Sequence, residues 1–380
     1  MSSPATTYPW NDPEIRKHYH PKLIEMYEEN EYAQYLAEHP VDVEGLSEIE
    51  KLRKNVAARF NYSTLKGHKY PVEELKDEID ISDSTITSYD GFEIPIKIYK
   101  HKTRTDTDSL HINYHGGGFS LGGGLTFDTN NLILLCAKTG VTIIDVDYRL
   151  VPEHHYTVSF LDGFAVFKYI SEHPEKFGIN RNKISVGGAS AGGKLSSTVG
   201  HLARDFNLPL KLVIANVPPG EDYSKHPDMK TVILNENFIK FNGDPGNTYS
   251  TVRFFEHFIV LGQTENPTEI TDNLDKIEAY FGRIDFLEPL QKYHQGDLYL
   301  SPNFQGLASH AIITAENDVL GSAGLGYAKK LIDNLIPVQV KTIKGLGHGW
   351  SNQGGIFKEA EEGLFYLAKL LKDVENDEIF

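Results

Sequence analysis

The sequence predicts an α/β fold with a mostly parallel central sheet flanked by helices. Runs typical of strands alternate with runs that have helical periodicity. The later strand-like runs are almost continuously apolar, as expected when helices cover both faces of a sheet. The alternation stops after residue 218 and resumes after residue 304. Because strands that alternate with helices pair in parallel, one α/β domain interrupted by an insertion accounts for these observations.

The predicted elements of this domain are short strands and longer helices. The strands cover residues 84–88, 93–99, 109–114, 141–147, 183–187, 211–217, 311–315 and 338–343. The helices cover residues 158–173, 190–205 and 322–334, with a last helix that ends near residue 372. That last helix carries Ala360, Leu364, Leu367 and Leu371 on one stripe, which is typical of a helix that packs on a core.

Three parts follow from this pattern. Residues 1–75 form a polar segment with helical stretches at 14–38 and 47–60, divided by a proline that disfavours helix in the residue before it. Residues 76–218 and 305–380 are expected to form the α/β domain. Residues 219–304 form an insertion too long to be a structureless loop in a compact fold, so it should carry helices of its own. We expect the first segment and the insertion to form a helical lid.

The composition excludes several classes of protein. A formal net charge of −16 argues against nucleic acid and against anionic membrane surfaces as partners. The lone cysteine, Cys136, cannot form an internal disulfide, and its apolar surroundings predict a small buried hydrophobe. The first residues lack the apolar region of a signal peptide, and no apolar stretch is long enough to span a membrane. We therefore expect a cytoplasmic protein without stable membrane insertion.

The candidate nucleophile is Ser190, in the sequence Gly188-Ala189-Ser190-Ala191-Gly192 between a predicted strand and a predicted helix. A serine hydroxyl is a weak nucleophile, so it must project at a sharp turn where a base can reach it. The flanking glycines remove Cβ atoms that would clash there. The alternative is a glycine-rich turn before an N-capping serine. The strand–turn–helix context favours catalysis.

A second glycine motif, His115-Gly116-Gly117-Gly118-Phe119, follows the strand at 109–114. Three successive glycines cost chain entropy, and they make sense if backbone N–H groups must approach a substrate oxygen closely. The expected oxyanion hole consists of the N–H groups of Gly117, Gly118 and Ala191. A phosphate-binding loop is excluded because no Gly-Lys-Ser/Thr follows. We interpret His115 as a residue that orients its own loop.

The candidate base and acid follow the last two predicted strands. His348 lies in a glycine-flanked loop after the strand at 338–343, and Asp318 follows the strand at 311–315. The order serine, aspartate, histidine places each group at the carboxyl end of a different strand, where α/β sheets hold their sites. Glu316 is the nearest rival acid. Asp285 and Glu288 are weaker candidates because they fall in the insertion.

Four motifs together resemble the hormone-sensitive-lipase family, also called the arylacetamide-deacetylase-like or bacterial type IV esterases, over residues 80–218 and 305–375. They are His115-Gly116-Gly117-Gly118-Phe119, Asp147-Tyr148-Arg149-Leu150-Val151-Pro152-Glu153-His154, the Gly188–Gly193 turn and Gly347-His348-Gly349-Trp350. The second is the most specific, and we expect Arg149 and Glu153 in it to bond structurally. The resemblance implies an α/β-hydrolase fold, carboxylester hydrolysis without a cofactor, and a lid.

The sequence departs from the family pattern in three places. Ala189 stands where the family usually has an acidic residue, and Gly321-Ser322 replaces charged residues after the acid loop. The spacing of 128 residues from Ser190 to Asp318 is long, whereas the 30 residues from Asp318 to His348 are ordinary. None of these departures removes a catalytic group.

We therefore expect a serine carboxylesterase that cleaves short-to-medium acyl or aryl esters through an acyl-enzyme on Ser190. An amidase, a lactonase or an acyltransferase would use the same three residues, because the fold does not fix the substrate. A catalytically silent receptor on the same fold is a further alternative. It is disfavoured because such proteins have lost a triad member, whereas Ser190, Asp318 and His348 are all present here.

The aromatic insertion bears on the substrate. Phe254, Phe255 and Phe258 either contact an apolar or aromatic group of a small-molecule ester or form a core within the insertion. The sequence is also compatible with a homodimer.

Overall fold

The computed structural model describes almost all of residues 76–218 and 305–380 and parts of the two remaining segments. The described residues are 8–29, short stretches between 34 and 56, 72–104, 106–122, 125–219, 240–241, 249–294 and 298–380.

An eight-stranded sheet forms the centre of this part of the chain, in the order β1-β2-β4-β3-β5-β6-β7-β8. Its strands are β1 (Ile79–Thr87), β2 (Glu93–His101), β3 (Leu110–Tyr114), β4 (Thr142–Val146), β5 (Ile184–Ala189), β6 (Leu212–Asn216), β7 (Ser309–Ala315) and β8 (Val338–Ile343). From β4 to β8 all neighbours pair in parallel, whereas β2 is antiparallel to β1 and to β4. The predicted mostly parallel sheet is confirmed.

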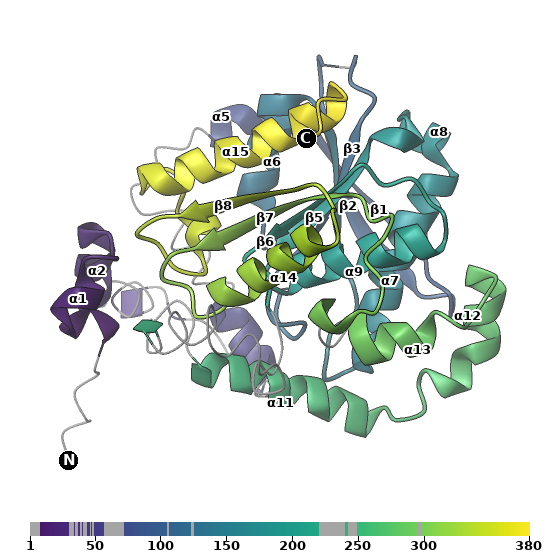
Figure 1. The fold of residues 1–380 in the computed structure, drawn as a ribbon, viewed down its shortest axis with the longest axis horizontal. Coiled ribbons are helices and arrows are strands. Elements are labelled where there is room, and N and C mark those ends of the chain that lie inside the picture. The colour runs from purple at the N-terminus through teal and green to yellow at the C-terminus, as the bar shows by residue number, and fades with distance from the viewer. Residues whose placement is uncertain are drawn as a thin grey trace.

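Helices cover both faces of the sheet (Figure 1). On one face lie α7 (Tyr156–Glu172), α9 (Ala191–Asp205) and α14 (Gly321–Asp333), and on the other lie α5 (Val72–Lys76), α6 (Thr129–Thr139) and α15 (Lys358–Glu375). The remaining helices are α1 (Pro13–Arg16), α2 (Pro21–Glu28), α8 (Pro174–Phe177), α11 (Tyr249–Glu265), α12 (Leu274–Phe281) and α13 (Leu287–Pro289). Short 3₁₀ turns lie at Pro9–Asn11, Arg181–Lys183, Thr271–Asn273, Leu298–Leu300 and Trp350–Gln353, and a π-helical turn at Leu290–His294.

The helix α6 was not predicted. Its residues from Leu132 to Ala137 are all buried, because the helix is packed between the sheet and α15. A helix that is apolar on every side lacks the amphipathic period by which helices are recognised. Cys136 lies in it, fully buried as predicted, and burial raises the pKa of its thiol to about 12.

The N-terminal helical stretch predicted at 14–38 is wrong as a single helix. The structure has α1 and α2, separated at Lys17–His20. Pro21 starts α2, and a proline disfavours helical backbone in the preceding residue, which here is His20. In the second predicted stretch, residues 49–56 are helical, and residues 57–60 lie outside the described part.

The insertion contains helices, as predicted for a segment of this length. Helices α11, α12 and α13 belong to it, while residues 220–239 and 242–248 lie outside the described part. In Figure 1, α11 runs along the lower edge of the view, and α1 and α2 lie on the side to which the arrowheads of β7 and β8 point.

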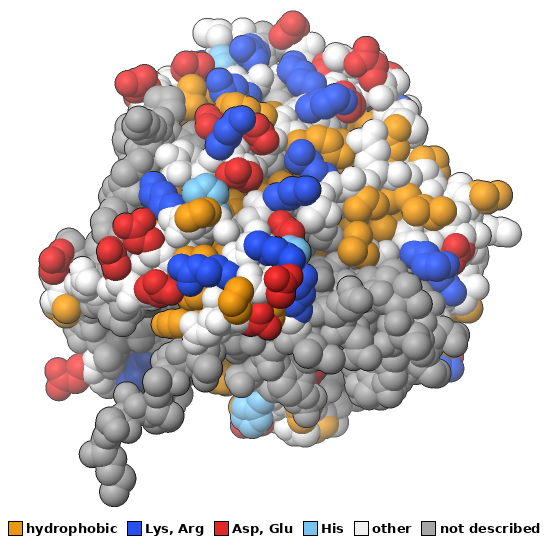
Figure 2. Space-filling model, turned by 60° about the vertical axis from the view of Figure 1, so that its left-hand side comes forward, with side chains coloured by type: hydrophobic (Ala, Val, Ile, Leu, Met, Phe, Trp, Pro, Cys, Tyr) orange, Lys and Arg blue, Asp and Glu red, His pale blue; other side chains and the backbone are white. Residues whose placement is uncertain are grey.

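One face of the surface is shown in Figure 2. Over its described part, Lys and Arg side chains intermingle with Asp and Glu side chains, so no single charge dominates there. Among the helices that the structure describes, none is both long and apolar enough to cross a bilayer.

Candidate active site

Ser190 lies in a strained turn between β5 and α9. Its φ of 56° and ψ of −119° are unusual for a residue with a side chain, and such strain is typical of functional turns. A Cβ at Gly188 would lie 2.1 Å from the Tyr114 carbonyl oxygen, and one at Gly192 would lie 1.8 Å from the same atom. The predicted need for glycine on both sides of Ser190 is confirmed, because the last residue of β3, Tyr114, lies directly against the turn.

The loop after β3 lies against this turn. A Cβ at Gly116 would be 2.9 Å from the carbonyl oxygen of Ala189 and 3.5 Å from the Cβ of Ser190. Gly117 and Gly118 have φ values of 113° and 60°, which glycine adopts without steric cost. In the described part of the chain, no backbone carbonyl accepts a hydrogen bond from their N–H groups. The loop thus lies against Ser190 at Gly116, and within the described residues the next two N–H groups have no backbone partner.

The buried side chain of His115 holds this loop in place. Its Nδ1 lies 2.7 Å from the Gly116 carbonyl oxygen, and since a carbonyl only accepts, Nδ1 carries the proton. The ring stacks on Tyr148 at 4.3 Å, and the Tyr148 hydroxyl donates to the His115 carbonyl oxygen. Burial lowers the pKa of His115, so the ring is neutral at neutral pH. These contacts agree with the interpretation of His115 as a loop-orienting residue.

Asp318 and His348 are brought together from the ends of β7 and β8. The Asp318 Oδ2 lies 2.7 Å from the His348 Nδ1, and its Oδ1 accepts from the backbone N–H of Leu320. The Asp318 side chain is fully buried, whereas that of His348 remains 15% exposed. Because the carboxylate accepts from Nδ1–H, the other ring nitrogen of His348 is left as an acceptor.

The His348 loop is anchored by its neighbours. Trp350 is buried, and its Nε1–H donates to Asn216 Oδ1 at the end of β6. A Cβ at Gly363 would lie 2.4 Å from the Trp350 ring, so α15 admits the indole only because it has glycine there. Asn317 N–H, next to Asp318, donates to the Leu346 carbonyl oxygen and ties the two loops together.

The rival acids have other partners. Glu316 lies 2.8 Å from Nδ1 of His18, between α1 and α2, and accepts from the Gly345 N–H. The other ring nitrogen of His18 lies 2.8 Å from the Lys240 Nζ. Asp285 pairs with Arg283 on the surface. The structure joins the acid and the base directly, whereas Ser190 follows β5, two strands from the strand of Asp318 and three from that of His348. The described residues show no hydrogen bond between the Ser190 hydroxyl and His348.

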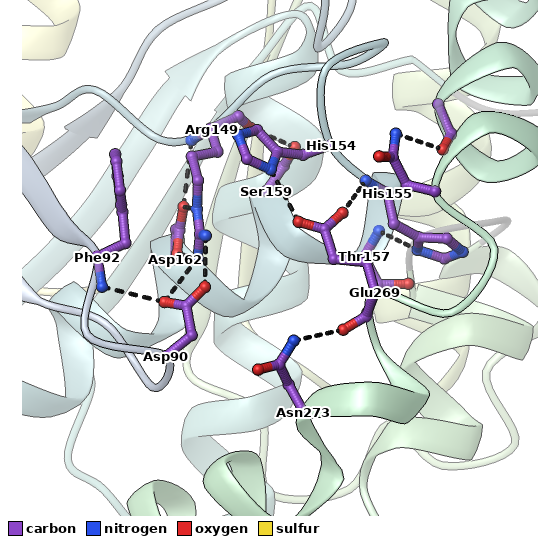
Figure 3. Close-up of polar contacts among 12 residues, drawn as sticks. Asp90, Phe92, Arg149, His154, His155, Thr157, Ser159, Asp162, Glu269 and Asn273 are labelled. Carbon is purple, nitrogen blue, oxygen red and sulfur yellow. Dashed lines mark hydrogen bonds and ion pairs between the residues drawn. The ribbon is translucent and has the colours of Figure 1, made fainter.

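The motif at 147–154 supports the site through a buried ion-pair network (Figure 3). Arg149 binds Asp162 through Nε at 2.8 Å and Asp90 through Nη1 at 2.6 Å. Although burial disfavours the charged form, these hydrogen bonds raise the pKa of Arg149 above its ordinary value. The N–H of Val151 donates to the Phe119 carbonyl oxygen. The motif therefore fixes the glycine loop, and the structural role expected for Arg149 is confirmed.

Arg53, in the N-terminal segment, reaches the same loop. Its guanidinium binds both carboxylate oxygens of Glu153, at 2.7 and 2.9 Å. It also donates to the carbonyl oxygens of Ser120 and Val151. Glu153 thus bonds structurally, as expected, but its partner could not be named from the sequence because Arg53 is 100 residues away and carries no motif.

A small cavity of about 50 Å³ with a mixed polar and apolar lining lies between the sheet, α6 and α15. Its polar and small residues include His111, Asn113, Asp128, Ala189, Asn216 and Ser351. The Asn113 amide donates to Asp128 and to Asp145. Burial, reinforced by Asp128, raises the pKa of Asp145 to about 8. Ala189, which stands in place of the family's acidic residue, therefore lines a cavity to which Asp128 already contributes a carboxyl group.

The donor sets do not suggest a metal centre. Among the described residues, no group of three or more His, Cys, Asp or Glu side chains is arranged to hold an ion.

Residues 111–352, well over half of the chain, match a family described as having the alpha/beta hydrolase fold. The chain belongs to this α/β-hydrolase family. Within it, the chain is 36% identical to carboxylesterase NlhH of Mycobacterium tuberculosis over 139 residues, which is 36% of this chain and 42% of NlhH. It is 26% identical to an arylesterase of Saccharolobus solfataricus over 307 residues, which is 80% of this chain and 85% of that protein.

Several relatives are matched over only part of their length. This α/β-hydrolase chain spans less than half of NlhH and 64% of lipase 2 of Moraxella sp.. Solved structures resemble it over most of their length. An esterase of Pyrobaculum calidifontis superposes with a TM-score of 0.70 at 20% identity, over 95% of this chain and all of that one. At such identity the likeness shows the fold alone.

Proposed function

We propose that this α/β-hydrolase is a serine carboxylesterase with Ser190 as nucleophile, His348 as general base and Asp318 as the acid that orients the histidine. The observation that carries the proposal is the 2.7 Å contact between Asp318 and His348 Nδ1, at the same sheet edge as the strained Ser190. The carboxylesterase and arylesterase names of the relatives support it.

The proposed reaction is acyl transfer. Ser190 attacks the ester carbonyl carbon while His348 takes the hydroxyl proton, and Asp318 holds the imidazole in the required tautomer and stabilises its charged form. The carbonyl oxygen becomes an oxyanion bound by the N–H groups of Gly117, Gly118 and Ala191. His348 then returns its proton to the leaving alcohol, and water hydrolyses the acyl-enzyme by the same steps.

The substrate we propose is a small ester with an apolar or aromatic group and a short-to-medium acyl chain. Residues 1–75 and 219–304 would cover the site as a lid. Hydrogen bonds from Arg53 to the Ser120 carbonyl oxygen and to Glu153 support this arrangement for the first segment. The chemistry we propose requires no cofactor.

The test is Ser190→Ala, assayed with a short-chain aryl ester. We expect kcat to fall on the order of 10⁶-fold, because the step has no other nucleophile. Covalent labelling by a fluorophosphonate should be present in the native protein and absent in the variant. Turnover within tenfold of native in a folded variant would overturn the assignment, and an unlabelled native protein would favour a silent receptor. Matched ester, amide and lactone substrates distinguish the esterase from the other acyl-transfer enzymes.

A further inference from the structure

One aromatic residue of the insertion lies directly on the glycine loop. A Cβ built on Gly118 would be 2.3 Å from Cγ of Phe255 and 2.4 Å from its Cδ1. The ring of Phe255 is therefore in van der Waals contact with the backbone of Gly118, on the side where any other residue would carry its side chain. Gly118 is separated from Phe255 by more than 130 residues of chain, so only the fold brings them together.

The three phenylalanines of this helix have different environments. Phe258 is buried and joins the main core, whereas Phe254 is 41% exposed. Phe255 is half-buried and packs at the border of the same core. The two alternatives from the sequence are therefore both incomplete. Phe258 contributes to the core of the whole domain, and Phe254 is partly exposed and packs edge-on against the rings of Phe255 and Phe258. Of the three, Phe255 is the one that reaches the glycine loop.

The position of the Phe255 ring is set by contacts further along α11 and just after it. A Cβ at Gly262 would lie 2.6 Å from the His154 carbonyl oxygen, so the helix backbone rests on the loop at 151–154. The Asn266 amide donates to the Pro152 carbonyl oxygen. Glu269 lies 2.8 Å from the His154 Nδ1 and accepts from the His155 N–H, as Figure 3 shows. Because these contacts hold the helix on the catalytic domain, the ring is held against Gly118.

We infer that Phe255 is a specificity-determining residue, which limits the length of the ester substituent that can lie beside the oxyanion donors. This inference rests on the proposed function. If the Gly118 N–H binds the carbonyl oxygen, a substituent on the carbonyl carbon must pass within a few ångströms of the Phe255 ring. A flat, partly exposed ring favours short or planar apolar groups and excludes longer flexible ones. A smaller residue at position 255 opens space there.

The experiment compares Phe255→Ala with Val260→Ala, an exposed position on the same helix, as the matched control. Two substrate series are used: aryl esters with acyl chains from acetate to decanoate, and acetate esters with alcohols from methyl to octyl. In Phe255→Ala we expect the ratio of kcat/KM for octyl-length over two-carbon substrates to rise about tenfold or more in one series, since a few methylenes in an apolar pocket are worth that much. In Val260→Ala both profiles should stay within about twofold of native.

A second variant guards against a general packing defect. Gly262→Ala introduces a Cβ against the His154 carbonyl oxygen and pushes α11 outward, so it should shift the same profile in the same direction by a smaller factor. Fluorophosphonate labelling of Ser190 is measured in every variant to show that the nucleophile is intact.

Unchanged length profiles in an active Phe255→Ala enzyme would overturn the inference and leave the esterase assignment standing. The same holds for an equal loss on all substrates, or for an equal shift in Val260→Ala. A native protein that neither turns over esters nor reacts with the fluorophosphonate would overturn both.

Discussion

The loops that carry the candidate triad and the two segments outside the α/β domain are attached to the sheet in different ways. The turn at Ser190 and the glycine loop touch through backbone, at positions where no Cβ fits. The two other segments are attached through side chains. Phe258 and Trp10 are examples of their buried apolar residues, and their polar contacts include the pairs Arg53–Glu153, His18–Glu316 and His154–Glu269. Where two backbones are in close contact, almost no substitution is tolerated. Side-chain contacts, in contrast, can be removed one at a time by substitution. We therefore expect catalysis and substrate selection to respond to separate sets of substitutions.

Among substitutions that keep the Ser190 nucleophile, the largest effect on catalysis is expected from Asp318→Asn. The amide would no longer hold the Nδ1–H tautomer of His348, and kcat should fall by about 10³–10⁴-fold with little change in stability. Steady-state kinetics with a short aryl ester measure this. The control is Glu316→Gln, two residues away, which loosens the contact with His18 on the covering side and should retain most activity. A larger loss in Glu316→Gln than in Asp318→Asn would reverse the assignment of the acid.

Arg149→Met should affect stability rather than chemistry. The substitution leaves Asp162, whose side chain is fully buried, without its partner, and breaking such a pair costs about 3–5 kcal/mol. Urea unfolding followed by circular dichroism measures the loss. The matched control is Arg283→Met, which breaks an exposed pair with Asp285 and should cost far less, because solvent screens such a pair. Equal losses in the two variants would show that the buried network contributes nothing beyond a surface pair.

Glu269→Gln gives the smallest expected effect. It tests how the insertion is attached, through the pH dependence of stability. Burial alone would raise the pKa of Glu269, but its hydrogen bonds with His154 and His155 outweigh this and hold the pKa below its ordinary value of 4.5. Its ionised form therefore stabilises the fold above pH 4.5, and this contribution is lost as pH falls through the lower folded pKa.

Urea unfolding at several pH values from neutral to acid measures this contribution. Glu269→Gln should be less stable than native at neutral pH, and the difference should shrink as the pH falls below 4.5. Glu265→Gln, an exposed position on α11, serves as the control and should follow the native curve. A difference that stays constant with pH would contradict the role given to the carboxylate.

Much of the sheet was predictable because its strands are buried and have clear ends. The strand β5 was predicted at 183–187 and lies at Ile184–Ala189. The strand β1 begins five residues earlier than predicted, because most of its side chains are not buried and the polar run Ser82–Ser84 interrupts the apolar alternation that Ile79 and Ile81 begin. The helix α6 was missed for the opposite reason, since it is buried on all sides. Sequence periodicity thus identifies elements with one buried face. It misses elements that are mostly exposed and elements that are buried on all sides.

The candidate triad could be proposed from chain order, because parallel strands deliver their carboxyl ends to one edge. The choice between Asp318 and Glu316 could not be derived that way, since both follow β7; the structure pairs Glu316 with His18 instead. The contacts of Arg53 and Phe255 with the glycine loop were also beyond sequence reasoning. These contacts join residues that are far apart in the sequence, and neither Arg53 nor Phe255 lies in a recognisable motif.

The buried carboxyl group of Asp145 changes the proton balance of folding. A formal net charge of −16 counts this residue as ionised, yet burial raises its pKa from 3.8 to about 8. At neutral pH the folded protein therefore keeps a proton that the unfolded chain gives up, and unfolding releases it. Since the folded state binds more protons here, the contribution of Asp145 to stability falls as the pH rises from about 4 to about 8. At neutral pH the native protein therefore carries less negative charge than its composition implies. The cause is Asp145 of β4, which takes no part in the proposed chemistry.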